Sequence, residues 1–132
     1  MTTTQSKAIK AYLSARKLNS QDVSPKLAKT IFELFRALQP VWDFQAQEER
    51  KIFDKHPNAD VLSGSMKIQD PDNPQSKEDA IKELSQLNEE LKELGEVETS
   101  VDFKKLKINV SNENLKFSGE DIANLEPFVE FE

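Results

Sequence analysis

The stretch from residue 24 to residue 56, SPKLAKTIFELFRALQPVWDFQAQEERKIFDKH, decides the fold of this chain. Its apolar residues recur three and four positions apart, which is the spacing of one face of an α-helix. Ser24 before Pro25 is typical of an N-cap followed by proline at the first helical position. The stretch therefore predicts a long helix from Pro25 to about His56, with an apolar face of Leu27, Ile31, Leu34, Phe35, Leu38, Val41, Trp42, Ala46, Ile52 and Phe53.

Pro40 interrupts this pattern. A proline inside a helix removes one backbone hydrogen bond and costs about 3 kcal/mol or more unless the helix kinks. The apolar face keeps its phase across Pro40, so we favour one kinked helix over two separate helices. Phe32 and Phe44 lie off the apolar face, and we expect them either to cover the N-terminal helix or to form an oligomer contact.

A second amphipathic helix is predicted over residues 76–95. Ser76 with Asp79 three residues later resembles a capping box, and Gly95 is a plausible glycine just after the helix end. Leucines recur between them at helical spacing. The two helices are expected to pack as an antiparallel hairpin in which Leu34, Leu38 and Trp42 face Leu84, Leu87 and Leu91.

The remaining segments complete a single domain over residues 1–132. Residues 1–5 are expected to be a frayed end, residues 6–56 helical beginning with a short helix over 6–17, and residues 57–75 a loop that is either mobile or functional. Within residues 101–132, the alternation at Leu106–Val110 and Leu115–Phe117 predicts a small β-hairpin, followed by one short helix that Ser118 caps. The predicted fold class is thus mainly α with a small β element (α+β).

Several kinds of chemistry are excluded by composition. The chain has no cysteine and one histidine, His56, so it lacks thiolate zinc sites and hydrolytic triads. Its three glycines are isolated and form no phosphate loop. Pairs of carboxylates are expected by chance on solvated helix faces when 32% of residues are charged. We therefore predict a protein that is not an enzyme, with no catalytic residue, no cofactor and no metal.

No stretch approaches the roughly 20 apolar residues of a membrane span, and residues 1–10 lack the apolar core of a signal peptide. A cytoplasmic protein is expected. Its net charge of −6 is unevenly distributed, because residues 1–40 carry seven basic and two acidic groups, whereas residues 76–132 carry seven basic and fifteen acidic groups. The simplest interpretation is that the basic part packs beside the acidic part.

The leading functional hypothesis is an interaction protein that binds a protein partner or a second copy of itself through its C-terminal segment. A hairpin of short strands leaves backbone groups unpaired at its edges, and apolar residues near the C-terminus add a contact area among glutamates. The alternative is that this segment only folds back over the helices. The candidate contact residues are Leu106, Ile108, Val110, Phe117, Phe128, Val129 and Phe131.

A second hypothesis is a small regulator that binds nucleic acid through the basic N-terminal helices. The segment from Ala8 to Leu38 fits a helix-turn-helix poorly, because its linker lacks the usual glycine and its second helix is too long for recognition. The candidate phosphate contacts are Lys7, Lys10, Arg16, Lys17, Lys26 and Lys29.

The order of these parts resembles a class of small accessory proteins encoded by tailed bacteriophages and prophages. The resemblance rests on the sequence segments KLAKT at 26–30, EERKIFDKH at 48–56, AIKELSQLNEEL at 80–91 and FSGEDIANLEPFVEF at 117–131. It implies an accessory or assembly role in the cytoplasm of a bacterial host. It implies no active-site residue.

Overall fold

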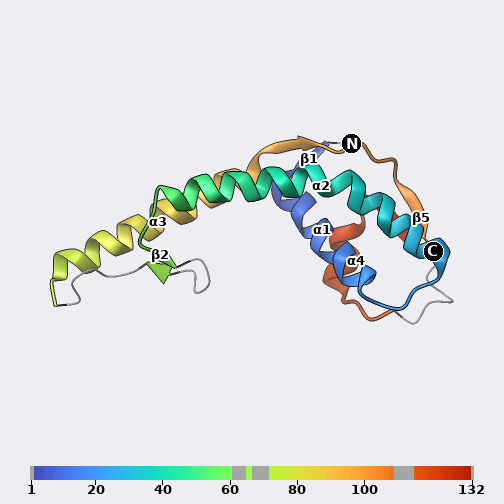
Figure 1. Ribbon diagram of the computed structural model, residues 1–132, viewed down its shortest axis with the longest axis horizontal. Helices are drawn as coiled ribbons and strands as arrows, with labels where there is room; N and C mark the ends of the chain where they lie inside the picture. The colour runs from blue at the N-terminus through green and yellow to red at the C-terminus, as the bar shows by residue number, and fades with distance from the viewer. Residues whose placement is uncertain (1, 61–64, 67–71, 109–114, 132) are drawn as a thin grey trace.

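The computed structural model describes residues 2–60, 65–66, 72–108 and 115–131. It is mainly α-helical with small β elements, as the sequence predicted. Figure 1 shows an elongated molecule in which α2 and α3 extend away from the other helices. The elements are β1 (Thr2–Thr4), α1 (Gln5–Asn19), α2 (Pro25–Asp54), β2 (Ala59–Asp60), β3 (Ser65–Met66), α3 (Pro74–Glu96), β4 (Glu98–Ser100), β5 (Leu106–Ile108), α4 (Gly119–Leu125) and β6 (Val129–Phe131).

Helix α2 begins as the sequence predicted and ends two residues earlier. The Ser24 side chain accepts a hydrogen bond from the backbone N–H of Leu27, and Pro25 occupies the first turn. The helix continues through Pro40 as a single element, bending in its central part (Figure 1). Pro40 has no N–H group, so the backbone carbonyl group one turn before it has no hydrogen-bond donor within the helix. Because Pro40 is exposed, water can bind this carbonyl group instead.

Helix α3 begins two residues before the predicted start. Asn73 is the N-cap, and its side-chain oxygen accepts a hydrogen bond of 2.9 Å from the backbone N–H of Gln75. Pro74 occupies the first turn. The predicted start at Ser76 is wrong because the preceding Asn-Pro pair provides the same combination of N-cap and proline that begins α2.

The other end of α3 also differs from the prediction. Gly95 lies inside the helix, which ends at Glu96. A Cβ atom at position 95 would lie 3.3 Å from the Cβ of Ser6 on α1. A side chain here would press on Ser6, so glycine suits the close approach of α3 to α1, and it does not terminate the helix.

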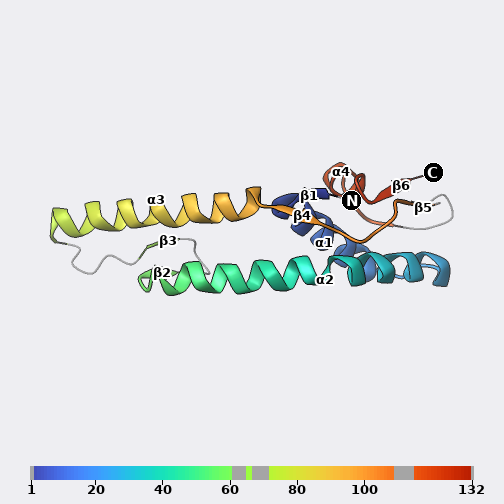
Figure 2. The same cartoon turned by 90° about the horizontal axis from the view of Figure 1, so that it is seen from above.

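The buried residues form two separate cores rather than the single core predicted. The larger core belongs to the body, which we define as β1, α1, the first half of α2, β4, β5, α4 and β6. The smaller core belongs to the arm, which we define as the second half of α2 together with α3 (Figure 2). The prediction that Leu34 and Leu38 face Leu87 is wrong, because the two leucines of α2 lie in the body core and Leu87 lies in the arm core.

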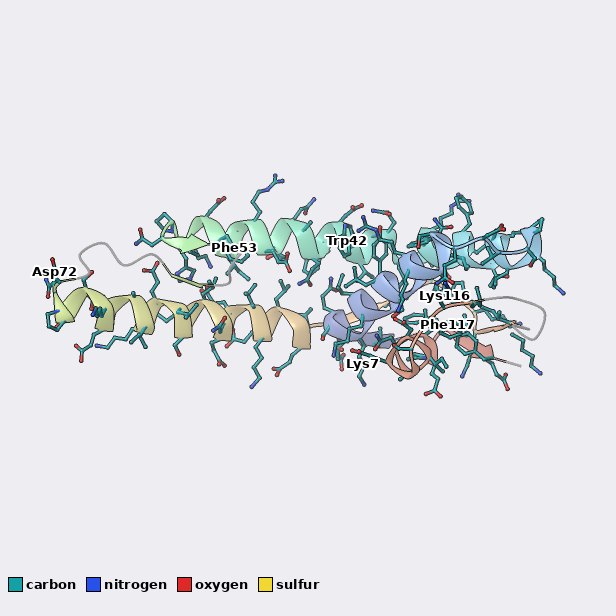
Figure 3. All side chains as sticks on the ribbon, turned by 90° about the horizontal axis from the view of Figure 1, so that it is seen from below. Lys7, Trp42, Phe53, Asp72, Lys116 and Phe117 are labelled. Atoms are coloured by element: carbon teal, nitrogen blue, oxygen red, sulfur yellow. The ribbon has the colours of Figure 1, made fainter. Side chains whose placement is uncertain are left out.

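Helices α2 and α3 nevertheless lie side by side and antiparallel in the arm, as Figure 2 shows. Ile52 of α2 belongs to the same buried core as Ala80, Leu87 and Leu94 of α3. Figure 3 shows Phe53 on the side of α2 that faces α3. The predicted helical hairpin therefore exists, but α3 packs against a part of α2 that lies several turns closer to the C-terminus than predicted.

The segment over residues 1–5 was predicted to be frayed, which is wrong for residues 2–5. Strand β1 pairs antiparallel with β4, with Thr3 opposite Thr99. Gln5 begins α1 and is fully buried, and its side-chain amide donates a hydrogen bond of 2.8 Å to the carbonyl oxygen of Val41. The polar N-terminus is ordered by backbone pairing and by this amide rather than by apolar residues.

The predicted C-terminal β-hairpin is also wrong. Strand β5 pairs in parallel with β6, with Lys107 opposite Glu130, and residues 115–117 form no strand. A parallel pair requires a crossover connection, which here contains α4. The predicted loop over residues 57–75 contains a short antiparallel pair of β2 and β3.

Candidate functional site

A hollow of about 760 Å³ lies on the body between α1, α4 and β6. This volume is in the usual range for ligand sites in proteins, about 300 to 1,000 Å³. Its walls come from α1 near the N-terminus and from α4 and β6 near the C-terminus. Its lining residues are Lys7, Lys10, Lys105, Ile122, Ala123, Asn124, Glu126, Pro127, Val129, Glu130 and Phe131.

Three exposed lysines give the hollow its charge. Lys7 and Lys10 lie one turn apart on α1, and Lys105 precedes β5. Figure 3 shows Lys7 on the side of α1 that lies next to α4. In the part of the chain that the structure describes, none of these three ammonium groups forms an ion pair. They are therefore available to an anionic group.

Glu126 and Glu130 also line the hollow and are exposed. With three lysines and two glutamates, the lining carries a small positive charge within a chain whose net charge is −6. The exposed side chain of Ile122 adds apolar surface. The hollow therefore offers cations, anions and apolar contact in one place.

Helix α4, which forms one wall, is fixed to α1 through Asp121. The Asp121 carboxylate accepts hydrogen bonds from the Ser14 hydroxyl at 2.9 Å and from the Lys17 ammonium at 2.7 Å. It also accepts a bond from the backbone N–H of Ser118, completing the capping box that begins α4. Burial alone would raise the pKa of Asp121, but the hydrogen bonds from Lys17, Ser118 and Ser14 together lower this pKa to about 2.

Strand β6 forms the wall on the other side of the hollow. Among the described residues it has one strand neighbour, β5, so its second edge has no strand partner. An open edge presents backbone N–H and C=O groups that can pair with an extended segment. The hollow thus lies beside an edge of β6 that no described strand covers, where Glu130 is exposed and Val129 is buried.

Most C-terminal candidates are placed differently from the contact patch that was predicted. Ile108, Phe128 and Val129 are at most 6% exposed and belong to the body core, so their proposed role as exposed contacts is corrected. Phe117 and Phe131 are half-buried, and their rings stack with centroids 5.8 Å apart. The C-terminal segment folds back over the helices because α4 and β6 bring these aromatic and branched residues onto α1 and α2.

The other two candidates are Leu106 and Val110. The backbone of Leu106 pairs with Val129 at the start of β5. Val110 lies outside the described residues. Phe131 lines the hollow and therefore stays a candidate contact.

The six lysine and arginine residues proposed as phosphate contacts lie in different parts of the structure. Lys7 and Lys10 line the hollow, whereas Lys17 is held by Asp121. Arg16 is exposed near the end of α1, and Lys26 and Lys29 are exposed in the first turns of α2. The predicted set thus contributes two lysines to the hollow.

Sequence reasoning missed Lys105. It lies in the run Lys104-Lys105-Leu106-Lys107, which is locally basic within an acidic C-terminal region. That run was interpreted only as the alternation of a strand. Its local charge was the signal that could have identified it.

His56 follows the end of α2 and contacts α3. Its ring is buried between the two helices of the arm, with Nδ1 3.3 Å from a Glu83 oxygen and Nε2 2.8 Å from a Glu90 oxygen. Both contacts join the end of α2 to α3. His56 therefore links the two helices of the arm.

No protein-family model, no curated protein and no solved structure matches this chain. The resemblance to phage accessory proteins therefore stays a prediction. Within the described residues, no group of three or more His, Asp or Glu side chains is arranged so that it could hold a metal ion. None of the described helices is long and apolar enough to cross a membrane.

Proposed function

We propose that this protein is a non-enzymatic interaction protein that binds an extended acidic segment of a protein partner in the lysine-lined hollow. The observation that carries the proposal is the convergence of Lys7, Lys10 and Lys105 beside β6. The hypothesis of a C-terminal binding surface is retained, but its contacts are the open strand edge and the lysines rather than the buried aromatic residues.

The open edge of β6 supports an extended partner. A segment that adds a strand gains affinity from main-chain hydrogen bonds and specificity from alternate side chains. Side chains of an added strand would alternate between the hollow and solvent. Carboxylates at every second position would then lie near the lysines, and an apolar residue could contact Ile122.

An acidic peptide fits the charge of the hollow better than a nucleic acid does. Nucleic-acid binding depends on many phosphate contacts. Here Glu126 and Glu130 stand among the three lysines and would repel a dense row of phosphates. A peptide can place carboxylates opposite the lysines and leave other positions neutral.

The experiment uses the full chain and a short fluorescein-labelled peptide of alternating valine and aspartate. We expect fluorescence anisotropy to show binding that weakens about tenfold or more when Lys7, Lys10 and Lys105 are all changed to glutamate. The same peptide with alternate backbone nitrogens methylated cannot complete strand pairing, so its binding should be lost.

The matched control changes Lys77, Lys82 and Lys92 to glutamate, because these lysines are exposed on α3 in the arm. This triple variant alters net charge by the same amount and should keep most of the binding. Equal loss in both triple variants, or unaltered binding of the methylated peptide, would refute the proposal. Tighter binding of a labelled oligonucleotide, lost in the variant of Lys7, Lys10 and Lys105, would favour the nucleic-acid regulator instead.

A further inference from the structure

Helix α2 has an exposed face along one edge of the molecule, on the side away from α3 and α4 (Figure 2). Residues at alternating spacings of four and three positions form one stripe on this face. All five are exposed, and Phe32 is 62% exposed. The stripe consists of Phe32, Arg36, Gln39, Asp43 and Ala46.

The stripe is complementary to itself when it is reversed about Gln39. Arg36 lies three residues before Gln39 and Asp43 lies four residues after it. Phe32 and Ala46 lie seven residues before and after the same point. In two antiparallel copies, Arg36 of each copy would therefore lie opposite Asp43 of the other. Phe32 of each copy would likewise lie opposite Ala46 of the other.

A groove of about 220 Å³ adjoins Ala46 and could receive the Phe32 ring of the other copy. A cavity of about 150 Å³ is enough to hold benzene. The groove is mainly apolar, and Trp42 on its wall is held by stacking on Tyr12 with ring centroids 4.5 Å apart. Its lining residues are Ile9, Leu13, Trp42, Gln45, Ala46 and Glu49.

Charge around the ring and around the groove is also complementary. Phe32 is flanked one turn away on each side by Lys29 and Arg36, both exposed. The groove is bordered by the Glu49 carboxylate and by the Gln45 side-chain amide. The basic surroundings of Phe32 would thus meet groups that accept hydrogen bonds.

We infer that α2 pairs with α2 of a second copy of this chain in a two-fold symmetric antiparallel dimer centred near Gln39. A two-fold interface uses the same patch on both copies, so each contact occurs twice. This surface is separate from the lysine-lined hollow, and the inference does not depend on the proposed function.

Charge exchange tests the pairing in sedimentation velocity over a range of protein concentrations. Arg36→Asp and Asp43→Arg each place like charges opposite one another and should raise the dimer dissociation constant about tenfold or more. The double variant restores opposite charges and should regain dimerisation. Phe32→Ser should also weaken the dimer, and its exposed position should leave the circular dichroism spectrum and melting temperature of the monomer unchanged.

Disulfide trapping tests the register, since the chain has no cysteine of its own. Gln39→Cys lies at the symmetry axis and should form a disulfide-linked dimer under mild oxidation. Arg50→Cys, on the same stripe, should remain unlinked because the two sulfurs would be about 30 Å apart at a rise of about 1.5 Å per residue. A monomer at every concentration, a failure of the double charge variant to recover, or equal linking at positions 39 and 50 would overturn the inference.

Discussion

The body and the arm share helix α2 but are stabilised in different ways. In the body, α2 packs against α1, where Ala8, Ala11 and Ala15 are fully buried and let the two helices approach closely. Among the described residues of the arm, α2 packs mainly against α3, and the buried residues are Ile52 on α2 and Ala80, Leu87 and Leu94 spread over about four turns of α3. The same helix is therefore an interior element at one end and half of a two-helix projection at the other.

The body differs from the arm because further elements pack on its pair of helices, α1 and α2. The body core joins residues of α1 and the first half of α2 with residues of the C-terminal part of the chain, including Val101 and Phe128. Among the described residues, the arm core is instead bordered by the half-buried Leu84 and Leu91. We therefore expect the body to unfold as a unit and the arm to open locally at lower free energy.

The largest effect is expected for Phe128→Ala. Phe128 is fully buried in the body and contacts the ring of Phe103, with centroids 6.3 Å apart. Removing the ring leaves a cavity and should lower the free energy of unfolding by about 3 to 5 kcal/mol. Urea denaturation followed by circular dichroism measures this loss. An unaltered midpoint would show that the C-terminal segment is not part of the body core.

A smaller effect is expected for Leu87→Ala in the arm. Leu87 is 3% exposed, but its neighbours are half-buried and can partly fill the space, so we expect a loss of about 2 kcal/mol. Hydrogen exchange should accelerate in α3 and the second half of α2 and remain slow in α1. Equal acceleration in α1 would mean that the body and the arm open together.

The smallest effect, which depends on pH, concerns Asp121 in the body. Its pKa is lowered from 3.8 to about 2, so its carboxylate stabilises the folded state above pH 4 and this contribution is lost as pH falls towards 2. Asp121→Asn should cost about 1 kcal/mol at pH 7. The difference in melting temperature between the two proteins should shrink as pH falls from 5 to 2. A constant difference would contradict the role of the ionised carboxylate.

The helices could be predicted from sequence because local chemistry determines where they begin. Ser24 with Pro25 and Ser118 with Asp121 both act as predicted. The start of α3 was missed because Ser76 with Asp79 has the same local signature as a true cap, and only the whole chain selects Asn73. Local patterns thus identify a helix better than they identify its first residue.

The division into body and arm could not be predicted, because one apolar face continues along α2 through Leu38 and Ile52. Periodicity shows that a residue is buried but not which element covers it. The parallel pairing of β5 with β6 likewise depends on a distant crossover. In the hollow, Lys7 and Lys10 were candidates, but their convergence with Lys105 exists only in the folded chain.

The close contact of Gly95 with Ser6 has a consequence for how the arm can change in length. It places the end of α3 against the start of α1, so the chain returns to the body beside α2, from which it departed. Insertion or removal of whole turns in both helices would keep this contact in register. A longer or shorter arm made in this way should therefore leave the body unaltered.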